Sequence, residues 1–364
     1  MRPGRFIGTT GPALNVEDFN ESSVPVTLST QFHVDTQFTT QDLALSLDMF
    51  SDRVLKPAVA AIANKIDRDG LVMAKNNTAN IVGTAGTPPT GLITYLTAAA
   101  YLDAEGAPRD GRRSCIVEPF TSATIVDSLK GLFVPQEAIG EQYRKGLMGR
   151  DSAGMNWKMD QNVVSQTFGS YSTSVLSCNT STATGFLTSG WASTSTIALS
   201  ATTATASLNV GDVIQIANVY AVNPQNRQAY GSNKLRNFVV TAAATVATSG
   251  TTSVTVSPAV ITAGQFQNVS VTSAGASTVT PFNNTGTVSP QNIIMHRNAF
   301  TLAVADLELP EGVHFAGRAS DKEIGLSMRV VRQYTINNDS IPTRLDVLYG
   351  WAPLYPELAC RVAA

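Results

Sequence analysis

A tract with almost no charge, residues 174–289, constrains the fold of this chain more than any other feature of its sequence. Ser and Thr make up about a third of it, and its only charged residues are Asp212, Arg227, Lys234 and Arg236. The segment "DVIQIANVYAV" alternates apolar and polar residues with the period of two that a half-buried strand requires. Similar short runs, separated by Gly, Asn and Pro, recur at the spacing of a β-barrel. The tract therefore predicts an all-β unit.

Low-complexity disorder is the alternative for this tract. Alternating β-branched residues and aromatic residues argue against it, because disordered segments are poor in both. The aromatic residues include Trp191, Tyr220, Tyr230, Phe238 and Phe266. Sequence of α+β type precedes the tract and strands of a different character follow it. We therefore expect a β-domain inserted into another domain.

A second pattern precedes the tract. Apolar residues three or four apart between 39 and 70 predict one long helix, with those residues on one face. Thr39 or Thr40 is expected to cap its start and Gly70 to end it, and Pro57 should kink or divide it. At about 1.5 Å per residue, such a helix would span about 40 Å, as a strut does. The residues on the predicted face are Leu43, Leu47, Phe50, Val54, Ala58, Ile62 and Ile66.

The remaining sequence predicts mixed elements. Residues 1–38 carry apolar residues two apart and several prolines, so an extended arm or hairpin is expected. Helices are predicted at 90–105 and 121–131, with a strand, "RRSCIVEP", between them. A hairpin is predicted around a turn at 337–339. Helix, strand and helix before the β-tract, and strands after it, indicate an α+β protein.

Charge is sparse in the whole chain. Charged residues make up 14% of the sequence and the formal net charge is −2, whereas soluble domains carry about 25% charged residues. Sparse charge weakens the repulsion between copies, which suggests that much of the surface is buried against other chains. A secreted β-rich protein is the alternative. However, the start lacks the apolar core of a signal peptide, and no stretch is long enough to cross a membrane.

No motif for catalysis or metal binding is present. The three histidines and three cysteines lie far apart, without the spacing of metal ligands or of a disulfide framework. Serine-nucleophile, P-loop and dinucleotide motifs are missing. The aspartates of "NKIDRDG" loosely resemble a calcium loop, but no terminal Glu completes it, and the end of a helix explains them better. We expect no enzyme, no cofactor, no catalytic residue and no metal site.

Four segments, in this order, carry a resemblance to a known family. They are "TTQDLALSLDMFSDRVLKPAVAAIANKID", "LNVGDVIQIANVYAVNP", "NIIMHRNAFTLAVADL" and "TRLDVLYGWAPLYPELACRV". Together they resemble the major capsid proteins of tailed bacteriophages. The closest likeness is to the coat proteins of short-tailed Salmonella phages, in which a β-barrel is inserted into the capsid fold.

The resemblance implies a Johnson-type fold, the α+β fold of tailed-phage and herpesvirus shells. Residues 1–38 would hold the N-terminal arm and extended loop, and 39–80 the spine helix of the peripheral domain. The axial domain and its connections would occupy 81–175, the inserted barrel 176–288, and the return strands 289–364. The uncharged segment near 180–196 would be the contact loop of the barrel, touching neighbours through Phe186 and Trp191.

The function implied is that of a major capsid protein, which self-assembles into an icosahedral shell around a double-stranded DNA genome. Its partners would be copies of itself in hexamers and pentamers, scaffolding and portal proteins, and, as a further candidate, decoration proteins. DNA would be touched only weakly and non-specifically, since no strongly basic surface is expected. No membrane contact is implied. Assembly would occur in the bacterial host cytoplasm, and the protein would reside in the virion.

Two other functions stay open at this point. A secreted or tail-associated β-rich adhesin or fibre module would explain the Ser/Thr-rich tract, although fibres rarely carry so much helix. An enzyme with a Ser or Thr nucleophile also stays open, because abundant hydroxyl residues would hide one. The assembly residues expected under the leading hypothesis are Leu43, Leu47, Phe50, Val54, Pro57, Ile62, Ile66, Phe186 and Trp191.

Overall fold

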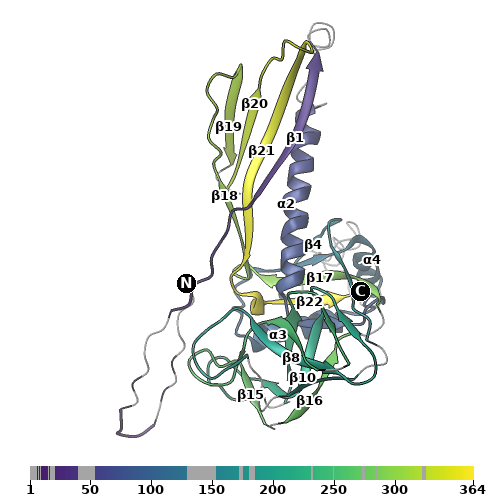
Figure 1. Cartoon of the computed structure of the whole chain (residues 1–364), viewed down its shortest axis with the longest axis vertical. Coiled ribbons are helices and arrows are strands. Elements are labelled where there is room, and N and C mark those ends of the chain that lie inside the picture. The colour runs from purple at the N-terminus through teal and green to yellow at the C-terminus, as the bar shows by residue number, and fades with distance from the viewer. Residues whose placement is uncertain are drawn as a thin grey trace, which may run out of the picture. The chain divides into compact units, whose positions relative to one another are not determined.

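The chain forms two compact units, which are described separately here (Figure 1). The body unit comprises Met1–Val24, Ala74–Phe300 and Pro353–Ala364, and the strut unit comprises Pro25–Met73 and Thr301–Ala352. The computed structural model describes residues 6, 8, 10–14, 16, 21–39, 54–128, 153–171, 175–179, 185–230, 233–248, 250–272, 275–283, 286–321 and 325–364.

The strut unit is built on a five-stranded sheet in the order β1-β21-β20-β19, in which β18 also pairs with β21. Its strands are β1 (Thr30–Thr39), β18 (Phe300–Ala305), β19 (Phe315–Asp321), β20 (Leu326–Arg332) and β21 (Ser340–Pro353). The predicted C-terminal hairpin is confirmed, because β20 and β21 pair in antiparallel fashion on either side of the turn that precedes Ser340. Figure 1 shows helix α2 running alongside this sheet.

Helix α2 (Lys56–Asn77) packs on one face of the strut sheet. Ala58, Ile62 and Ile66 are buried, as their spacing predicts, and they pack with Leu345 and Val347 of β21. Pro57 is the second residue of α2. A π-helical turn at residues 54–55 precedes it.

The predicted end of this helix is wrong, and so is Thr39 as its cap, while the alternative cap Thr40 lies outside the described residues. Thr39 does not cap a helix; it is the last residue of β1 and pairs with Ser340 of β21. Gly70 does not end the helix, which continues to Asn77. The glycine serves packing instead: a Cβ placed on it would lie 2.7 Å from Cζ2 of Trp351. The predicted residues Leu43, Leu47 and Phe50 lie outside the described part of the chain.

The alternating segment near the N-terminus forms a strand, but its partner is distant. All ten residues of β1 pair in antiparallel register with β21, from Thr30 opposite Tyr349 to Thr39 opposite Ser340. Phe32 and Val34 pack with the core under α2. The segment is therefore part of a sheet assembled across about three hundred residues, rather than a hairpin with itself.

The body unit contains a six-stranded mixed sheet in the order β2-β22-β17-β3-β4, in which β5 pairs with β17. Its elements are β2 (Ile81–Gly83), α3 (Leu92–Ala104), β3 (Arg113–Val117), α4 (Pro119–Ser128), β4 (Asn156–Met159), β5 (Ser165–Thr167), β17 (Val288–His296), the 3₁₀ turn η2 (Pro356–Leu358) and β22 (Ala359–Ala363). Both predicted helices and the strand between them are present. Tyr95 and Leu102 of α3 pack against Ile294 and Val362 of the sheet.

The charge-poor tract folds as a closed six-stranded antiparallel barrel. The ring runs β11-β13-β8-β6-β16-β10 and closes through the pairing of β10 with β11. Its strands are β6 (Leu176–Asn179), β8 (Ser195–Ala201), β10 (Val213–Ala221), β11 (Leu235–Val240), β13 (Thr252–Ser257) and β16 (Ala276–Pro281). Outside the ring lie β15 (Val269–Val271) on β10, the pair β9 (Ala206–Leu208) with β12 (Ala244–Val246), and the pair β7 (Phe186–Leu187) with β14 (Val260–Ile261).

The barrel interior is apolar. Ile214, Ile216 and Val219 of β10, with Phe238 and Val240 of β11, are fully buried in one cluster. The period-two alternation of the sequence places these residues inward, as expected for a barrel. Burying this much apolar surface gives the Ser/Thr-rich tract the core that a disordered segment lacks.

Candidate assembly surfaces and the barrel junction

The spine residues predicted for assembly divide into core and surface. Ile62 is 0% exposed and Ile66 is buried, so both hold α2 onto its own sheet. Val54 is half-buried and Pro57 is exposed. These two residues help to line an open apolar cavity of about 540 Å³ between the end of β1 and the start of α2. Its other lining residues are Val34, Thr36, Gln37, Phe38, Ala58 and Ala61.

The face of the strut sheet opposite α2 is organised around a buried carboxylate. Asp346 of β21 is 0% exposed, while its neighbours Leu345 and Val347 point toward α2. Arg329 donates from Nε to Oδ1 at 3.0 Å and from Nη2 to Oδ2 at 2.6 Å. Gln31 of β1 donates to Oδ2 at 3.0 Å. This two-bond arginine–carboxylate pairing is among the strongest side-chain interactions, and it raises the pKa of Arg329.

Two further arginines lie on this face. Arg318 lies directly opposite Arg329 in the β19–β20 register, and its Nη1 lies 3.2 Å from Oδ2 of Asp306. Arg344 lies 3.3 Å from Asp346 and its side chain is 43% exposed. Three arginines thus share this face with three carboxylates, because Asp35 of β1 lies opposite Arg344 in the β1–β21 register and on the same side of the sheet as Gln31. We define Arg318, Arg329 and Arg344 as the arginine face.

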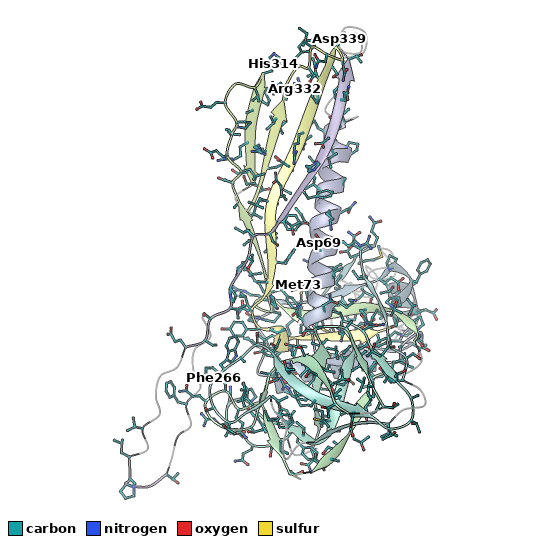
Figure 2. The ribbon with its side chains drawn as sticks, viewed as in Figure 1. Asp69, Met73, Phe266, His314, Arg332 and Asp339 are labelled. Carbon is teal, nitrogen blue, oxygen red and sulfur yellow. The ribbon has the colours of Figure 1, made fainter. Side chains whose placement is uncertain are left out.

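Asp69, one of the residues that loosely resemble a calcium loop, lies within α2 (Figure 2). It accepts a hydrogen bond from the Tyr349 hydroxyl at 2.7 Å and pairs with Lys65 at 2.6 Å. Burial, and then the bond to Asp69, raise the pKa of Tyr349. The carboxylate therefore joins helix to sheet.

Within the body unit, a buried ion pair ties the barrel to helix α3. Glu105 follows the last residue of α3, and its Oε1 pairs with Nη1 of Arg236 on β11. Both side chains are under 10% exposed. A carboxylate is disfavoured at a helix C-terminus, where the dipole is negative, and the guanidinium offsets this. The Tyr230 hydroxyl also donates to the carbonyl of Ala104, so the last turn of α3 is held at two points.

A second anchor lies at the Gly-Asp turn before β10. Asp212 is 0% exposed, and its Oδ2 accepts hydrogen bonds from the backbone N–H groups of Gly169 and Asn209, both at 2.9 Å. Its Oδ1 accepts from Nε2 of Gln166 at 2.9 Å. Burial raises the pKa of Asp212, and these hydrogen bonds oppose the shift. The turn is thereby fixed to the segment that enters the barrel.

Two cations lie near this anchor. Lys75, near the end of α2, donates to Oε1 of Gln166 at 2.7 Å, and burial lowers its pKa to about 8, with a smaller contribution from Arg361. Arg361 of β22 is 0% exposed, and burial lowers its pKa to about 10. None of its three guanidinium nitrogens has a hydrogen-bond acceptor among the described residues. The negative charge of Asp212 therefore favours the protonated form of Arg361, because it raises the pKa that burial lowers.

The predicted contact residues of the barrel lie beside a short strand. Phe186 is on β7, which pairs in parallel with β14, and its ring packs against the barrel core. Trp191 is half-buried, whereas residues 188–190 between the two are exposed. Phe186 is thus partly a core residue. Residues 180–184 of the predicted loop lie outside the described part.

The histidines and cysteines are dispersed. His33 pairs with Asp35 at 2.9 Å, His296 with Asp110 at 3.2 Å, and His314 accepts from the Tyr334 N–H at 2.7 Å. Figure 2 shows His314 near Arg332 and Asp339 at one end of the strut sheet. The three free cysteines are buried, which raises the pKa of each thiol. Among the described residues no His, Cys, Asp and Glu group could hold a metal, and no helix there is long and apolar enough to span a membrane.

The sequence analysis did not identify the Glu105–Arg236 ion pair or the buried Asp212 turn, although the rarity of charge in this tract was a usable signal. Only four residues of the charge-poor tract carry charge, and Asp212, Lys234 and Arg236 all lie where the barrel meets the body. A rare charge in such a tract is costly to bury alone, so its retention indicates a specific partner. The partners themselves, Gln166 and Glu105, have no distinguishing pattern in sequence.

Comparison with known proteins adds one match over nearly the whole chain. The family model described as "P22 coat protein - gene protein 5" matches residues 8–361. The match includes the strut sheet, the mixed sheet and the barrel. No curated protein matches the chain.

Solved structures of phage capsids are similar to the chain in fold. The capsid structure of cyanophage P-SCSP1u has a TM-score of 0.50 at 9% identity, covering 100% of this chain and 82% of that one. The mature capsid of bacteriophage PhiM1 gives 0.47 at 10% identity, with coverages of 99% and 79%. A Mycobacterium phage Che8 structure gives 0.41 at 10% identity, with coverages of 96% and 76%. The first supports a shared fold.

Proposed function

The chain belongs to the P22 coat protein family, and on that premise we propose how its parts serve a phage shell. It is a major capsid protein, copies of which form the shell. The observation that carries this conclusion is the single family match over residues 8–361, together with the shared fold of a cyanophage capsid. An adhesin or fibre module is not favoured, and the role needs no enzymatic step.

We assign the parts of the chain to a Johnson-type subunit. The N-terminal arm and extended loop occupy 1–38, the axial domain and its connections 81–175, the inserted barrel 176–288, and the return strands 289–364. The barrel strands Leu176–Pro281 and the antiparallel pairing of β17 with β22 support the last two ranges. The spine of the peripheral domain is assigned to 40–80 instead of 39–80, because Thr39 belongs to the strand β1.

The shell we propose is icosahedral, built from hexamers and pentamers of this chain, and encloses double-stranded DNA. Low charge supports many modest contacts between copies, each repeated by symmetry. A net charge of −2 supports only weak, non-specific contact with DNA. Scaffolding, portal and decoration proteins are its further partners, assembly takes place in the host cytoplasm, and the virion is its final location.

The arginine face is the assembly contact that we propose for the strut unit, and its occupant is an acidic surface of a second copy. The support is the exposure of its guanidinium groups, because 32% of the Arg318 side chain and 43% of the Arg344 side chain are accessible. Partly exposed charges at an interface favour fast, specific docking more than tight binding. Contact through this face should therefore weaken as salt rises.

A charge-removal series tests this contact. Arg318→Gln and Arg344→Gln remove charge without adding a carboxylate beside Asp346, and Arg68→Gln on the exposed side of α2 is the matched control. We expect the first two to slow shell formation, measured by sedimentation velocity, while the unfolding midpoint of the subunit stays near that of the parent. Assembly rates equal to those of Arg68→Gln would contradict the assignment of this face.

A further inference from the structure

A pocket of about 310 Å³ lies where the barrel meets helix α3, entirely within the body unit. One wall is the last part of α3, with Ala100, Tyr101 and Ala104. The other is the barrel, with Ala221 at the end of β10 and the first residues of β11. Three alanines on facing walls leave the space open, and its volume lies at the lower end of the range for small-molecule sites.

The barrel wall of this pocket carries a buried hydrogen-bond donor without an acceptor. Arg236 is 5% exposed, and its Nε has no hydrogen-bond acceptor among the described residues. Its Nη1 pairs with Glu105. The next residue, Asn237, is occupied differently, because its Oδ1 accepts from Gln215 at 2.6 Å and its side chain lies against the Tyr101 hydroxyl. Arg236 thus presents a buried N–H group that an acceptor would satisfy.

The charged residues that line the pocket favour a negatively charged ligand. Glu105 is neutralised by Arg236, which leaves the ammonium of Lys234 as the excess charge. Lys234 is exposed, and its Nζ lies 4.9 Å from the centroid of the Tyr101 ring. The cation is therefore held at the mouth of the pocket by an aromatic ring rather than by a carboxylate.

From these observations we propose that the pocket binds a small aromatic carboxylate. Its carboxylate accepts a hydrogen bond from Nε of Arg236 and is attracted by Lys234. Its ring packs against Tyr101 and the alanine side chains, where aromatic contact adds to apolar burial. Because the two walls belong to α3 and to the barrel, an occupant would also hold the barrel on the body. This site is separate from the assembly surfaces proposed above.

Three probes separate the parts of this proposal in the full-length protein. Benzoate carries both ring and charge, benzamide keeps the ring and carbonyl without the charge, and acetate keeps the charge without the ring. We expect saturable benzoate binding by saturation-transfer NMR, with a dissociation constant on the order of 1 mM for so small a ligand. Benzamide should bind several-fold more weakly and acetate should not compete.

Two variants tie the binding to the pocket. Ala100 is exposed on α3, so Ala100→Phe should fill the mouth without disturbing the core and should abolish benzoate binding. Ile93→Phe, at a 71% exposed position of the same helix outside the lining, is the matched control and should bind like the parent. Lys234→Gln should weaken benzoate binding several-fold and leave benzamide binding unchanged.

The results that would overturn the proposal are equally definite. Absence of saturable benzoate binding would mean that water alone satisfies Nε of Arg236. Undiminished benzoate binding in Ala100→Phe would place the binding elsewhere on the protein. Equal competition by acetate would remove the aromatic part of the proposal. None of these results bears on shell formation, so failure here leaves the capsid function unaffected.

Discussion

Trp351 lies so close to Gly70 that no side chain fits between them. A Cβ on Gly70 would lie 2.7 Å from Cζ2 and 2.8 Å from Cε2 of the indole. The indole Nε1 donates to the carbonyl of Ile66 at 3.0 Å, one turn earlier on α2. The tryptophan is thus both packed on the helix and bonded to it, and the glycine is what permits this approach.

Gly70→Ala should therefore destabilise the protein although alanine favours helix. The helix preference of alanine is worth about 1 kcal/mol, while overpacking against a rigid ring costs about 1–3 kcal/mol. We expect a net loss of about 1 kcal/mol in the free energy of unfolding, measured by urea denaturation. Trp351→Phe in the same background should recover part of the loss. A more stable Gly70→Ala variant would contradict the packing described for these residues.

Helix α2 offers a matched pair that tests its buried face. Ile62 is 0% exposed and Val59 is 40% exposed on the same helix. Ile62→Asp buries an unpaired charge, so we expect a loss of several kcal/mol and insoluble or unassembled protein. Val59→Asp should remain soluble and folded by circular dichroism. Similar behaviour of the two variants would show that α2 does not pack through the face that contains Ile62.

The ion pair between Glu105 and Arg236 should behave as a coupled unit. Arg236→Met alone leaves a buried carboxylate without its partner, and we expect a loss of about 3–5 kcal/mol in stability. The double variant Glu105→Gln with Arg236→Met removes both charges and should lose clearly less stability than Arg236→Met alone. The check is a double-mutant cycle from chemical denaturation. Additive losses would mean that the two side chains are not energetically coupled.

Lys75 should make stability depend on alkaline pH. Its pKa is lowered from 10.5 to about 8 in the folded protein, first by burial and then by Arg361. Between about pH 8 and 10.5 the folded state has lost this proton and the unfolded chain still binds it, so unfolding takes up a proton and stability rises with pH.

The measurement is the difference in unfolding free energy between the parent and Lys75→Met across this range. The difference should shift in favour of the parent as the pH rises, because the variant has no proton to release. Tyrosines also titrate at high pH, but they contribute to both proteins and cancel in the difference. Arg361 is coupled to Lys75, so the part of the difference that reports Lys75 itself is read near pH 8, below the pKa of Arg361 at about 10. A difference that does not change with pH would show that Lys75 titrates normally in the folded state.

Local periodicity was enough to predict much of the fold. The spacing of three or four identified the buried face at Ala58, Ile62 and Ile66, and the spacing of two identified the barrel strands. The end of α2 was misplaced because glycine commonly ends helices, and the reason for Gly70 is a tryptophan far away in the sequence. Likewise, the partner of β1 is β21, and no local signal encodes that register.

The junction between barrel and body could be predicted only in part. The Gly-Asp turn marks Asp212 as a turn residue, but its buried bonds to Gln166 and Gly169 depend on the assembled fold. Arg236 and Glu105 lie 131 residues apart, and neither has a motif. A pairwise contact of this kind follows from tertiary geometry, which periodicity and propensity do not contain.

Electron microscopy of the protein expressed alone and together with the scaffolding protein of its phage tests the central claim most directly. The account predicts closed icosahedral shells in which every subunit carries a discrete six-stranded barrel formed by the strands between Leu176 and Pro281. A protein that remains monomeric under every assembly condition, or that assembles into fibres instead of shells, would contradict it.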